Sequence, residues 1–280
     1  MMLTETAYAK INLALHVRAR RADGFHQIES LFAFAEHGDV LSASAREDGE
    51  LLLTIEGPFA RDLNAGPDNL VLRAADALRR RHDVTLGADM HLAKNLPVAS
   101  GIGGGSADAA AALRLLSRLW GLDGSVDLLP IAAELGSDVP ACFVSHTLVG
   151  TGRGEKLEPG RIDGLSGTPL LLVNPGAALS TAAVFAGWDQ QDRGALPALN
   201  LSDILSHARN DLQSPAMALV PQIADVLAAL EGLEGLVFAR MSGSGATCFA
   251  LLRDEIALTR AAADLQNARP DWWIMESQVR

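Results

Sequence analysis

Apolar and polar residues alternate along the first part of the chain in a way that is typical of β-strands. Residues 8–17 and 51–57 show this two-residue period, which places successive side chains on opposite faces of a sheet. Between residues 69 and 82 the period lengthens to that of a helix, and Asn69 is a suitable residue to begin it. One face of this predicted helix carries Leu70, Ala74, Ala75 and Leu78.

A glycine-rich segment follows the next predicted strand, at residues 90–97. After the glycines, an apolar, alanine-rich stretch predicts a long helix over about 106–120, and a second helix is predicted over about 126–135. The apolar run that follows Asp138 has the character of a strand. The first part of the chain therefore predicts a domain that contains both helices and strands.

The last part of the chain has a simpler order of elements. Strand, helix, strand, strand, helix and strand follow one another, which is the order of the ferredoxin-like arrangement. The segment 155–168 is dense in Gly, Pro and charged residues, so we expect a domain boundary there and assign domains 1–158 and 159–280. The predicted elements are residues 170–176, 221–233, 235–241, 246–252, 254–268 and 272–276.

Composition limits the classes of function. The 280 residues are 49% apolar and 20% charged, which is typical of a folded globular protein, and the formal net charge of −11 argues against binding to nucleic acid or an anionic membrane. Cys142 and Cys248 lie in apolar stretches without other Cys or His at the spacing of metal ligands. We find neither a signal peptide at the start nor a bilayer-spanning apolar run, so we expect a reducing, cytoplasmic location.

The strongest chemical signal is the segment PVASGIGGGSADAAAAL, residues 97–113. Gly101, Gly103, Gly104 and Gly105 precede a predicted helix start near Ser106. Glycines let the main chain approach a bulky anion, and the free amides at a helix N-terminus bind phosphate. The segment lacks the Gly-Lys-Ser/Thr of a P-loop and the third glycine of a dinucleotide-binding fingerprint. The alternative is a flexible linker before a core helix.

Three weaker signals accompany this loop. The SGSG turn at residues 242–245 lies between two predicted strands and could be an ordinary hairpin turn. Lys10 stands in an otherwise apolar strand, where an edge lysine that reaches solvent is the usual interpretation. Asp138 follows a helix end and Gly136, and by itself would be a solvated turn residue.

Together these segments resemble the GHMP kinase superfamily, which includes galactokinase, homoserine kinase and mevalonate kinase. The DGFH and GSDVP elements are typical of a single branch of that superfamily, which acts on a cytidine diphosphate derivative. The resemblance spans residues 7–247 and is carried by AKINLAL, RADGFHQIESLF, PDNLVLRAA, GIGGGSADAA, LGSDVPACF and MSGSGAT.

The resemblance implies a two-domain α+β fold, with an N-terminal S5-like α/β domain and a C-terminal ferredoxin-like domain, and with ATP and substrate in the cleft between the halves. It implies that ATP, with Mg²⁺, phosphorylates the 2-hydroxyl of a methylerythritol moiety in the non-mevalonate route to isoprenoids. The expected partners are these small molecules, with no nucleic acid and no membrane. Oligomeric state is left open.

The resemblance also implies roles for individual residues. Asp138 would accept the hydroxyl proton, Lys10 would hold the hydroxyl and offset charge, and Ser106 would bind the metal. His26 would hydrogen-bond cytosine stacked between Phe25 and Phe185. The expected ATP-binding residues are Asn69, Lys94, Pro97, Val98, Ala99, Ser100, Gly101, Ile102, Gly103, Gly104, Gly105, Ser106 and Ala107, with Asn69 and Lys94 near the adenosine. The expected substrate-binding residues are Asn12, Phe25, His26, Thr181, Phe185, Gly243, Ser244 and Gly245.

Two positions depart from the family pattern, and three other functions compete. Phe25 stands where the family often has Tyr, and Ser137 stands where Ala is common. A homoserine- or mevalonate-type kinase is disfavoured by the DGFH element and the aromatic pair, because those substrates have no base to stack. A non-catalytic nucleotide-sensing module is disfavoured by the presence of both Lys10 and Asp138. An S5-like nucleic-acid binder is disfavoured by the negative charge.

Overall fold

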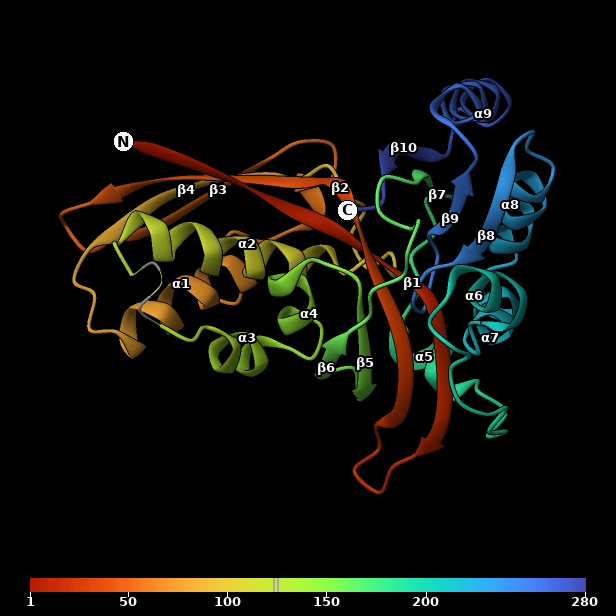
Figure 1. The fold of residues 1–280 in the computed structure, drawn as a ribbon. Helices are drawn as coiled ribbons and strands as arrows, with labels where there is room; N and C mark the ends of the chain where they lie inside the picture. Colours follow the sequence, from red (N-terminus) through yellow and green to blue (C-terminus); the bar gives the residue numbers. More distant parts are fainter. Residues whose placement is uncertain (123, 125) are drawn as a thin grey trace. The chain divides into compact units, whose positions relative to one another are not determined.

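The structure is a computed structural model that describes residues 1–122, 124 and 126–280 (Figure 1). The chain divides into two compact units. Unit 1 consists of Met1–Ala9, His37–Val98 and Gly103–Val144, and unit 2 consists of Lys10–Glu36, Ala99–Ile102 and Ser145–Arg280. Each unit has several segments because β1 (Met2–Arg20) and β2 (His26–Arg46), which pair with each other, contribute residues to both. The contiguous boundary at residues 158 and 159 therefore stays a prediction.

Unit 1 combines strands with a layer of helices. β3 (Leu51–Glu56) pairs in parallel with β4 (Gly87–Ala93), and β4 pairs antiparallel with residues 40–46 of β2. A short 3-10 turn, η1 (Ala60–Asp62), follows β3. The helices are α1 (Leu70–Arg81), α2 (Gly104–Leu119), α3 (Leu129–Leu135) and α4 (Val139–Val144).

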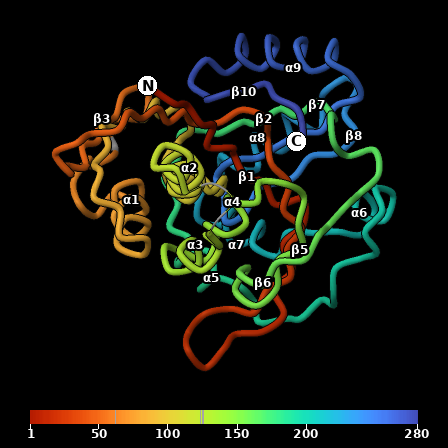
Figure 2. Tube along the Cα trace, turned by 60° about the vertical axis from the view of Figure 1, so that its left-hand side comes forward, coloured from red at the N-terminus to blue at the C-terminus, as the bar shows by residue number. Residues whose placement is uncertain are grey.

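Helix α2 is the central helix of unit 1. Ala109, Ala110, Ala111 and Ala112 are fully buried, and these small side chains let neighbouring helices approach closely. Helices α1 and α4 both pack against α2, and α1 lies alongside it in Figures 1 and 2. The N-terminus of α2, where the predicted phosphate loop ends, is thus held by a well-packed core.

Unit 2 contains the predicted ferredoxin-like arrangement. Its four-stranded antiparallel sheet has the order β10-β7-β9-β8, and α8 and α9 pack on it, with α9 beside β10 in Figure 2. In sequence order this is the strand arrangement 4-1-3-2, so the prediction is confirmed. The elements are β7 (Pro169–Asn174), α8 (Gln222–Glu231), β8 (Leu236–Met241), β9 (Cys248–Leu252), α9 (Glu255–Ala268) and β10 (Trp273–Gln278).

Further elements surround this core in unit 2. Strand β5 (Leu148–Gly152) pairs antiparallel with β2 and with β6 (Lys156–Pro159). Three short helices are inserted between β7 and α8: α5 (Thr181–Ala186), α6 (Leu201–His207) and α7 (Gln213–Leu219). The hydrophobic core joins alternate residues of β7 and β9 to the apolar faces of α8 and α9. It includes Leu171, Val173, Cys248, Ala250, Ile223, Leu230, Leu258 and Ala262.

Several predicted elements differ from the structure. The run after Asp138 is not a strand but helix α4, because Pro140 is tolerated in a first helical turn and a short apolar run fits either element. Helix α2 begins at Gly104, two residues before the predicted start, so Gly104 and Gly105 are helical. The strand predicted at residues 90–97 is β4, which ends at Ala93. The helix predicted from residue 126 is α3, which begins at Leu129, and the strand β2 was not predicted.

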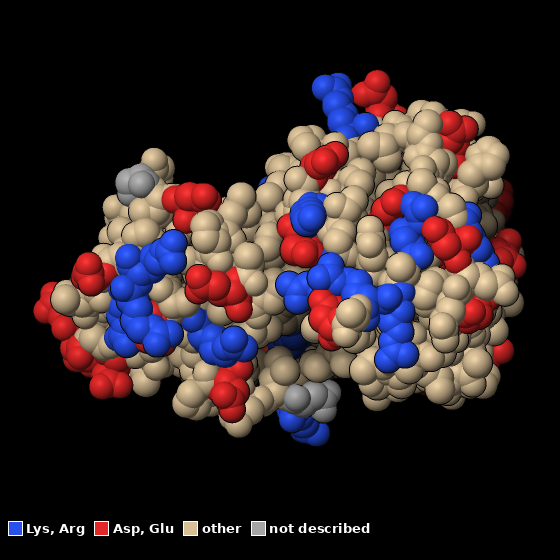
Figure 3. Space-filling model, turned by 90° about the horizontal axis from the view of Figure 1, so that it is seen from below, with Lys and Arg blue, Asp and Glu red and all other residues tan. Residues whose placement is uncertain are grey.

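On the face drawn in Figure 3, basic side chains lie among acidic ones. Exposed arginines in both units form ion pairs, for example Arg80 with Asp76 at 2.9 Å and Arg260 with Glu234 at 2.7 Å. Such pairs are screened by solvent and contribute little stability. Within the described residues, every helix is too short or too polar to cross a bilayer.

Candidate active site

The glycine-rich segment ends at the N-terminus of α2, as the anion-binding interpretation requires. Gly103 is the N-cap residue and has a φ of 67°, which a glycine adopts without a steric cost. The amide of Ala107 donates to the carbonyl of Gly103 at 2.8 Å and makes the first helical bond. The amides of the preceding turn have no partner within the helix, so they can bind an anion.

The start of α1 lies beside the start of α2. A Cβ atom on Gly105 would contact Cδ1 of Leu70 at 3.6 Å. Asn69, expected near the adenosine of ATP, caps α1: its Oδ1 accepts from the amide of Val71 at 2.9 Å, and its Nδ2 donates to the carbonyl of Asn64 at 2.9 Å. The structure thus brings Asn69 close to the end of the glycine loop, although its role in ATP binding stays a prediction.

Lys94 is buried inside unit 1. Its side chain is 2% exposed, and its Nζ donates to Oδ2 of Asp39 at 2.5 Å and to Oδ2 of Asp108 at 2.6 Å. These two bonds use two of the three N–H groups of the ammonium, so little of its hydrogen-bonding capacity is left for ATP. The expected place of Lys94 near the adenosine stays a prediction. Burial alone would lower the pKa of Lys94, but Asp108 and Asp39 outweigh burial and raise it.

Asp108 carries a perturbed carboxyl group. Burial, and to a smaller extent Asp39, raise its pKa to about 7 against the opposing effect of Lys94. Among the described residues, Oδ1 of Asp108 has no hydrogen-bond partner. Asp39 is different, because its Oδ1 accepts from the amides of Asn95 and Leu96 at 2.6 and 2.8 Å.

Lys10 is not an edge lysine that reaches solvent. It is 4% exposed, its Nζ donates to Oδ1 of Asn12 at 3.2 Å, and it lies 4.7 Å from the centre of the Phe32 ring. Asn12, also buried, donates from Nδ2 to Oγ of Ser30 at 2.7 Å. This second bond fixes the amide so that its oxygen faces the ammonium of Lys10.

The two glycine turns meet within unit 2. Oγ of Ser242 donates to the carbonyl of Gly101 at 3.0 Å, and the amide of Thr247 donates to the carbonyl of Ser100 at 3.1 Å. A Cβ atom on Gly101 would lie 2.5 Å from the carbonyl oxygen of Ser242. Position 101 therefore has to be glycine, and the two turns form a single main-chain surface.

Other polar groups support the second turn. Nδ2 of Asn210 donates to the carbonyls of Met241 and Gly243, both at 2.8 Å. Ser244 and Thr181, both expected to bind substrate, share a hydrogen bond between their hydroxyl oxygens at 2.9 Å. The structure thus brings Thr181, at the start of α5, to the SGSG turn.

The aromatic residues expected around a base, Phe25, His26 and Phe185, take part in three ring contacts. The rings of His26 and Phe185 are stacked, with centroids 4.9 Å apart, and Trp188 meets His26 edge-on at 5.7 Å. Phe25 is 55% exposed and lies under the guanidinium of Arg153 at 5.1 Å. Burial, with a smaller effect of Arg20, lowers the pKa of His26, so its imidazole is neutral at pH 7 and carries one donor and one acceptor.

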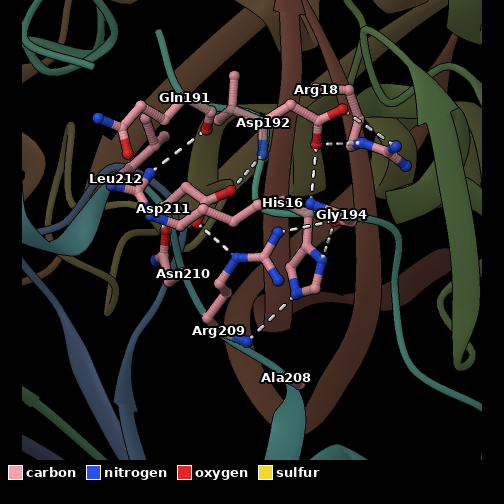
Figure 4. Close-up of polar contacts among 12 residues, drawn as sticks. His16, Arg18, Gln191, Asp192, Gly194, Ala208, Arg209, Asn210, Asp211 and Leu212 are labelled. Atoms are coloured by element: carbon pink, nitrogen blue, oxygen red, sulfur yellow. Dashed lines mark hydrogen bonds and ion pairs between the residues drawn. The ribbon is translucent and has the colours of Figure 1, made fainter. Parts of the chain in front are cut away.

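His16 fixes the segment that follows Trp188 (Figure 4). Its Nε2 accepts from the amide of Arg209 at 3.2 Å, so its Nδ1 carries the proton and donates to the carbonyl of Gly194 at 3.2 Å. Burial, and then Arg209, lower the pKa of His16. Arg18 adds a bond from Nε to Asp192 at 2.8 Å. The loop between α5 and α6 is thereby tied to β1.

Asp138 immediately precedes helix α4. Its side chain is half-buried, and its carbonyl accepts from the amide of Cys142 at 3.0 Å. The neighbouring Ser137, one of the two departures from the family pattern, is exposed. The carboxylate therefore sits on a short, well-anchored turn.

Metal ligands are less well defined. The described residues contain no group of three or more His, Cys, Asp or Glu side chains with the arrangement of a metal site. Ser106, in the first turn of α2, offers a hydroxyl oxygen, a donor type that suits Mg²⁺ when nucleotide phosphates supply further oxygens. Its assignment as a metal ligand stays a prediction.

Sequence reasoning missed several residues of this site. Asp39 and Asp108 lie 55 and 14 positions from Lys94, and Asn210 lies more than 30 positions from the turn that it supports. An acidic residue inside an alanine-rich helix, as at Asp108, was the one signal available in the sequence.

Known families match most of this architecture. Residues 69–146 match the family described as GHMP kinases N terminal domain, and residues 195–271 match GHMP kinases C terminal. The chain is 53% identical over 282 residues to the 4-diphosphocytidyl-2-C-methyl-D-erythritol kinase of Rhizorhabdus wittichii, covering 99% of this chain and 94% of that protein. It is 49% identical to the kinase of the same name from Parvibaculum lavamentivorans, covering 97% of this chain and 96% of that protein.

Solved structures extend the likeness. A crystal structure of 4-(cytidine 5'-diphospho)-2C-methyl-D-erythritol kinase matches with a TM-score of 0.81 and 32% identity, over 99% of each chain. Homoserine kinase from Cytophaga hutchinsonii matches with a TM-score of 0.70 and 17% identity, over 98% of this chain and 95% of that one. The second match shows a shared fold alone.

Proposed function

The chain belongs to the GHMP kinases and, within them, to the 4-diphosphocytidyl-2-C-methyl-D-erythritol kinase family, and we propose that it transfers the γ-phosphoryl group of ATP to the 2-hydroxyl of 4-diphosphocytidyl-2-C-methyl-D-erythritol. The observation that carries this proposal is the identity of 53% over 99% of the chain to a kinase of that name. Its product would enter the non-mevalonate route to isoprenoids.

In this proposal the glycine loop and the starts of α2 and α1 bind the nucleotide. The amides of the first turn of α2 and the glycine loop, residues 97–107, would hold the phosphates, while Asn69 would lie near the adenosine. Mg²⁺, held by Ser106 and the phosphates, would neutralise charge on the transferred group. Glycines at positions 103–105 leave the main chain open to a close approach by the anion.

Unit 2 would bind the acceptor. His26 can donate to or accept from the polar edge of cytosine, depending on its tautomer, and a nearby main-chain group could complete the pair. Phe25 and Phe185 offer aromatic faces for stacking. Thr181 and the turn Gly243–Gly245 would contact the rest of the substrate. Asn12 would act by orienting Lys10.

The proposed chemistry is a single displacement. The 2-hydroxyl oxygen attacks the γ-phosphorus, the bond from that phosphorus to the β,γ-bridging oxygen breaks, and ADP leaves. The hydroxyl proton passes to the carboxylate of Asp138. Lys10 would hold the hydroxyl and offset the charge that spreads over the transferred group. Because phosphoryl transfer has a loose transition state, positioning and charge matter more than a strong base.

A coupled assay of ADP release tests the proposal. We expect ADP release with 4-diphosphocytidyl-2-C-methyl-D-erythritol and none above background with homoserine or mevalonate. Turnover of homoserine or mevalonate instead would indicate another GHMP kinase. ATP binding without turnover of any acceptor would indicate a nucleotide-sensing module on the same fold.

A further inference from the structure

Three charged side chains form a buried cluster in unit 1, which we call the ion cluster: Asp39, Lys94 and Asp108. Their exposed fractions are 0%, 2% and 3%. Charged groups are rarely buried this far unless they are paired and hydrogen-bonded, because loss of hydration is costly. The three side chains of the ion cluster therefore depend on one another, because each charge is stabilised by the pairing.

One side of the ion cluster fixes the main chain that enters the glycine loop. Asp39, on β2, uses Oδ2 for the ammonium of Lys94 and Oδ1 for the amides of Asn95 and Leu96. Nδ2 of Asn95 adds a bond to the carbonyl of Gly38 at 3.2 Å. The chain is thus tied to β2 immediately before Pro97.

The other side of the ion cluster fixes the helix that leaves the loop. Asp108 lies on α2 and binds Lys94 at 2.6 Å. The ammonium also lies directly against the first helical residue, because a Cβ atom on Gly104 would be 3.1 Å from Nζ of Lys94. Lys94 therefore contacts both the strand side and the helix side of the loop.

The chain leaves unit 1 after Val98 and returns to it at Gly103. These two points need a fixed spacing if the amides of the first turn of α2 are to be ready for an anion. We propose that Lys94 is a positioning residue, whose ammonium joins Asp39 to Asp108 and so pre-organises the phosphate-binding end of the glycine loop without itself touching ATP. Pre-organised donors lose less ordering entropy on binding. The inference deepens the proposed function and rests on it for the identity of the anion.

Asp108→Ala is the most direct test. It removes the helix side of the ion cluster but leaves Lys94 paired with Asp39, so no buried charge is left alone. Lys94 is the group that donates a hydrogen bond to the carboxylate of Asp108, and removing that carboxylate also relieves its unfavourable interaction with Asp39. Alanine also suits this alanine-rich helix.

Binding of AMP, ADP and ATP is measured by calorimetry, and kcat and KM are measured in the ADP-release assay. We expect Asp108→Ala to weaken ATP and ADP binding about tenfold, AMP binding by less than about threefold, and the acceptor KM hardly at all. Asp108→Asn, which keeps an acceptor for Lys94, should restore most of the ATP affinity.

Glu5→Gln is the matched control. Glu5 binds Arg114 at 2.8 Å and Arg118 at 2.5 Å, both on α2 but away from the loop. It should lower the unfolding temperature without changing ATP affinity. If Asp108→Ala also lowered only the unfolding temperature, the ion cluster would be purely structural and the inference would be overturned.

An equal loss for AMP, ADP and ATP would also overturn the inference, because it would place Lys94 at the nucleoside. Calorimetry separates this inference from the proposed function. Wild-type protein that binds ATP but turns over no acceptor would contradict the function and leave the loop test intact.

Discussion

Gly243 closes directly on Gly101: a Cβ atom on Gly243 would lie 2.7 Å from the carbonyl oxygen of Gly101. The glycine turn of the ferredoxin-like sheet and the glycine loop thus share a main-chain contact within unit 2. The requirement for glycine here comes from this contact as well as from the positive φ values of 56° and 79°.

Gly101→Ala should therefore destabilise the protein more than an alanine at a glycine that has only a positive φ. Gly176 is the matched control in the same unit, because it has a φ of 74° and a Cβ atom added there would meet no other atom within 4 Å. We expect Gly176→Ala to cost about 1 kcal/mol and Gly101→Ala about 1–3 kcal/mol more. Urea unfolding measures both, and equal costs would mean that the two turns can move apart freely.

Gly103 and Gly105 should differ in their effect on ATP. Gly103→Val forces a β-branched residue into a φ of 67°, so we expect severe loss of ATP binding. Gly105→Ala meets only an ordinary contact with Leu70 at 3.6 Å, so any loss of ATP affinity there would report contact with the ligand rather than disturbance of the fold. Calorimetry with ATP checks both variants, and unchanged affinity in both would exclude this loop from the nucleotide site.

Asp138→Asn should affect turnover more than binding. We expect kcat to fall by roughly 10²–10⁴, as is usual for a positioned acid–base group, while the KM for the acceptor stays within a few fold. Lys10→Ala should lower kcat similarly. Asn12→Ala should have a smaller effect of the same kind, since it removes the acceptor that orients Lys10. Near-normal turnover by Asp138→Asn would make this carboxylate structural.

Two variants separate the contribution of stacking to cytosine recognition from that of hydrogen bonds to the polar edge of the base. Phe25→Ala should raise KM equally for the cytidine substrate and its uridine analogue, because stacking contributes about 1–3 kcal/mol for any base. His26→Ala should instead reduce the preference for cytidine, because uracil exchanges the donor and acceptor on the edge that His26 would read and leaves buried partners unpaired. The measurement is the ratio of kcat/KM for the cytidine substrate to that for its uridine analogue, in the wild type and in both variants. Equal use of both by the wild type would remove the cytosine-reading role.

His16 predicts a pH dependence of stability. Its pKa is lowered in the folded protein, so between that value and 6.5 the unfolded chain binds the proton and the folded chain does not. The contribution of His16 to the free energy of unfolding should be fully present above pH 6.5. It should decrease as the pH falls below 6.5. His16→Gln should lose stability at pH 7 but show a shallower decrease on acidification. Identical pH profiles for variant and wild type, from urea titrations, would contradict this assignment.

Sequence patterns predicted the parts of the fold that depend on local order. The ferredoxin-like arrangement followed from short strands separated by clear turns and by two helices, and α2 followed from its alanine-rich helical period. Strand β2 escaped prediction because its 21 residues mix apolar, small and charged positions instead of alternating strictly. Its role depends on pairing with β4 and β5, which lie far along the chain.

In the candidate site too, local motifs could be predicted from the sequence, whereas contacts between distant residues could not. The glycine loop and SGSG turn are local motifs, so their positions could be predicted, but their contact through Gly101 and Ser242 joins residues 141 positions apart. The burial of Lys94 could not be predicted either, because it depends on Asp39 and Asp108 arriving from two other elements. Trp188 gave no sign in the sequence that it would meet His26.

The division of the chain into units has a consequence for biosynthesis and for engineering. The chain changes unit after residues 9, 36, 98, 102 and 144, so no single cut separates one unit from the other. Within unit 2, the amide of Arg280 donates to the carbonyl of Phe34 at 2.8 Å, and Val279 bridges to Ala35. During synthesis, unit 2 can therefore make these contacts only after residues 279 and 280 have been added to the chain. Recombination between relatives would accordingly have to exchange both units together, and neither can be moved into another protein as a continuous cassette.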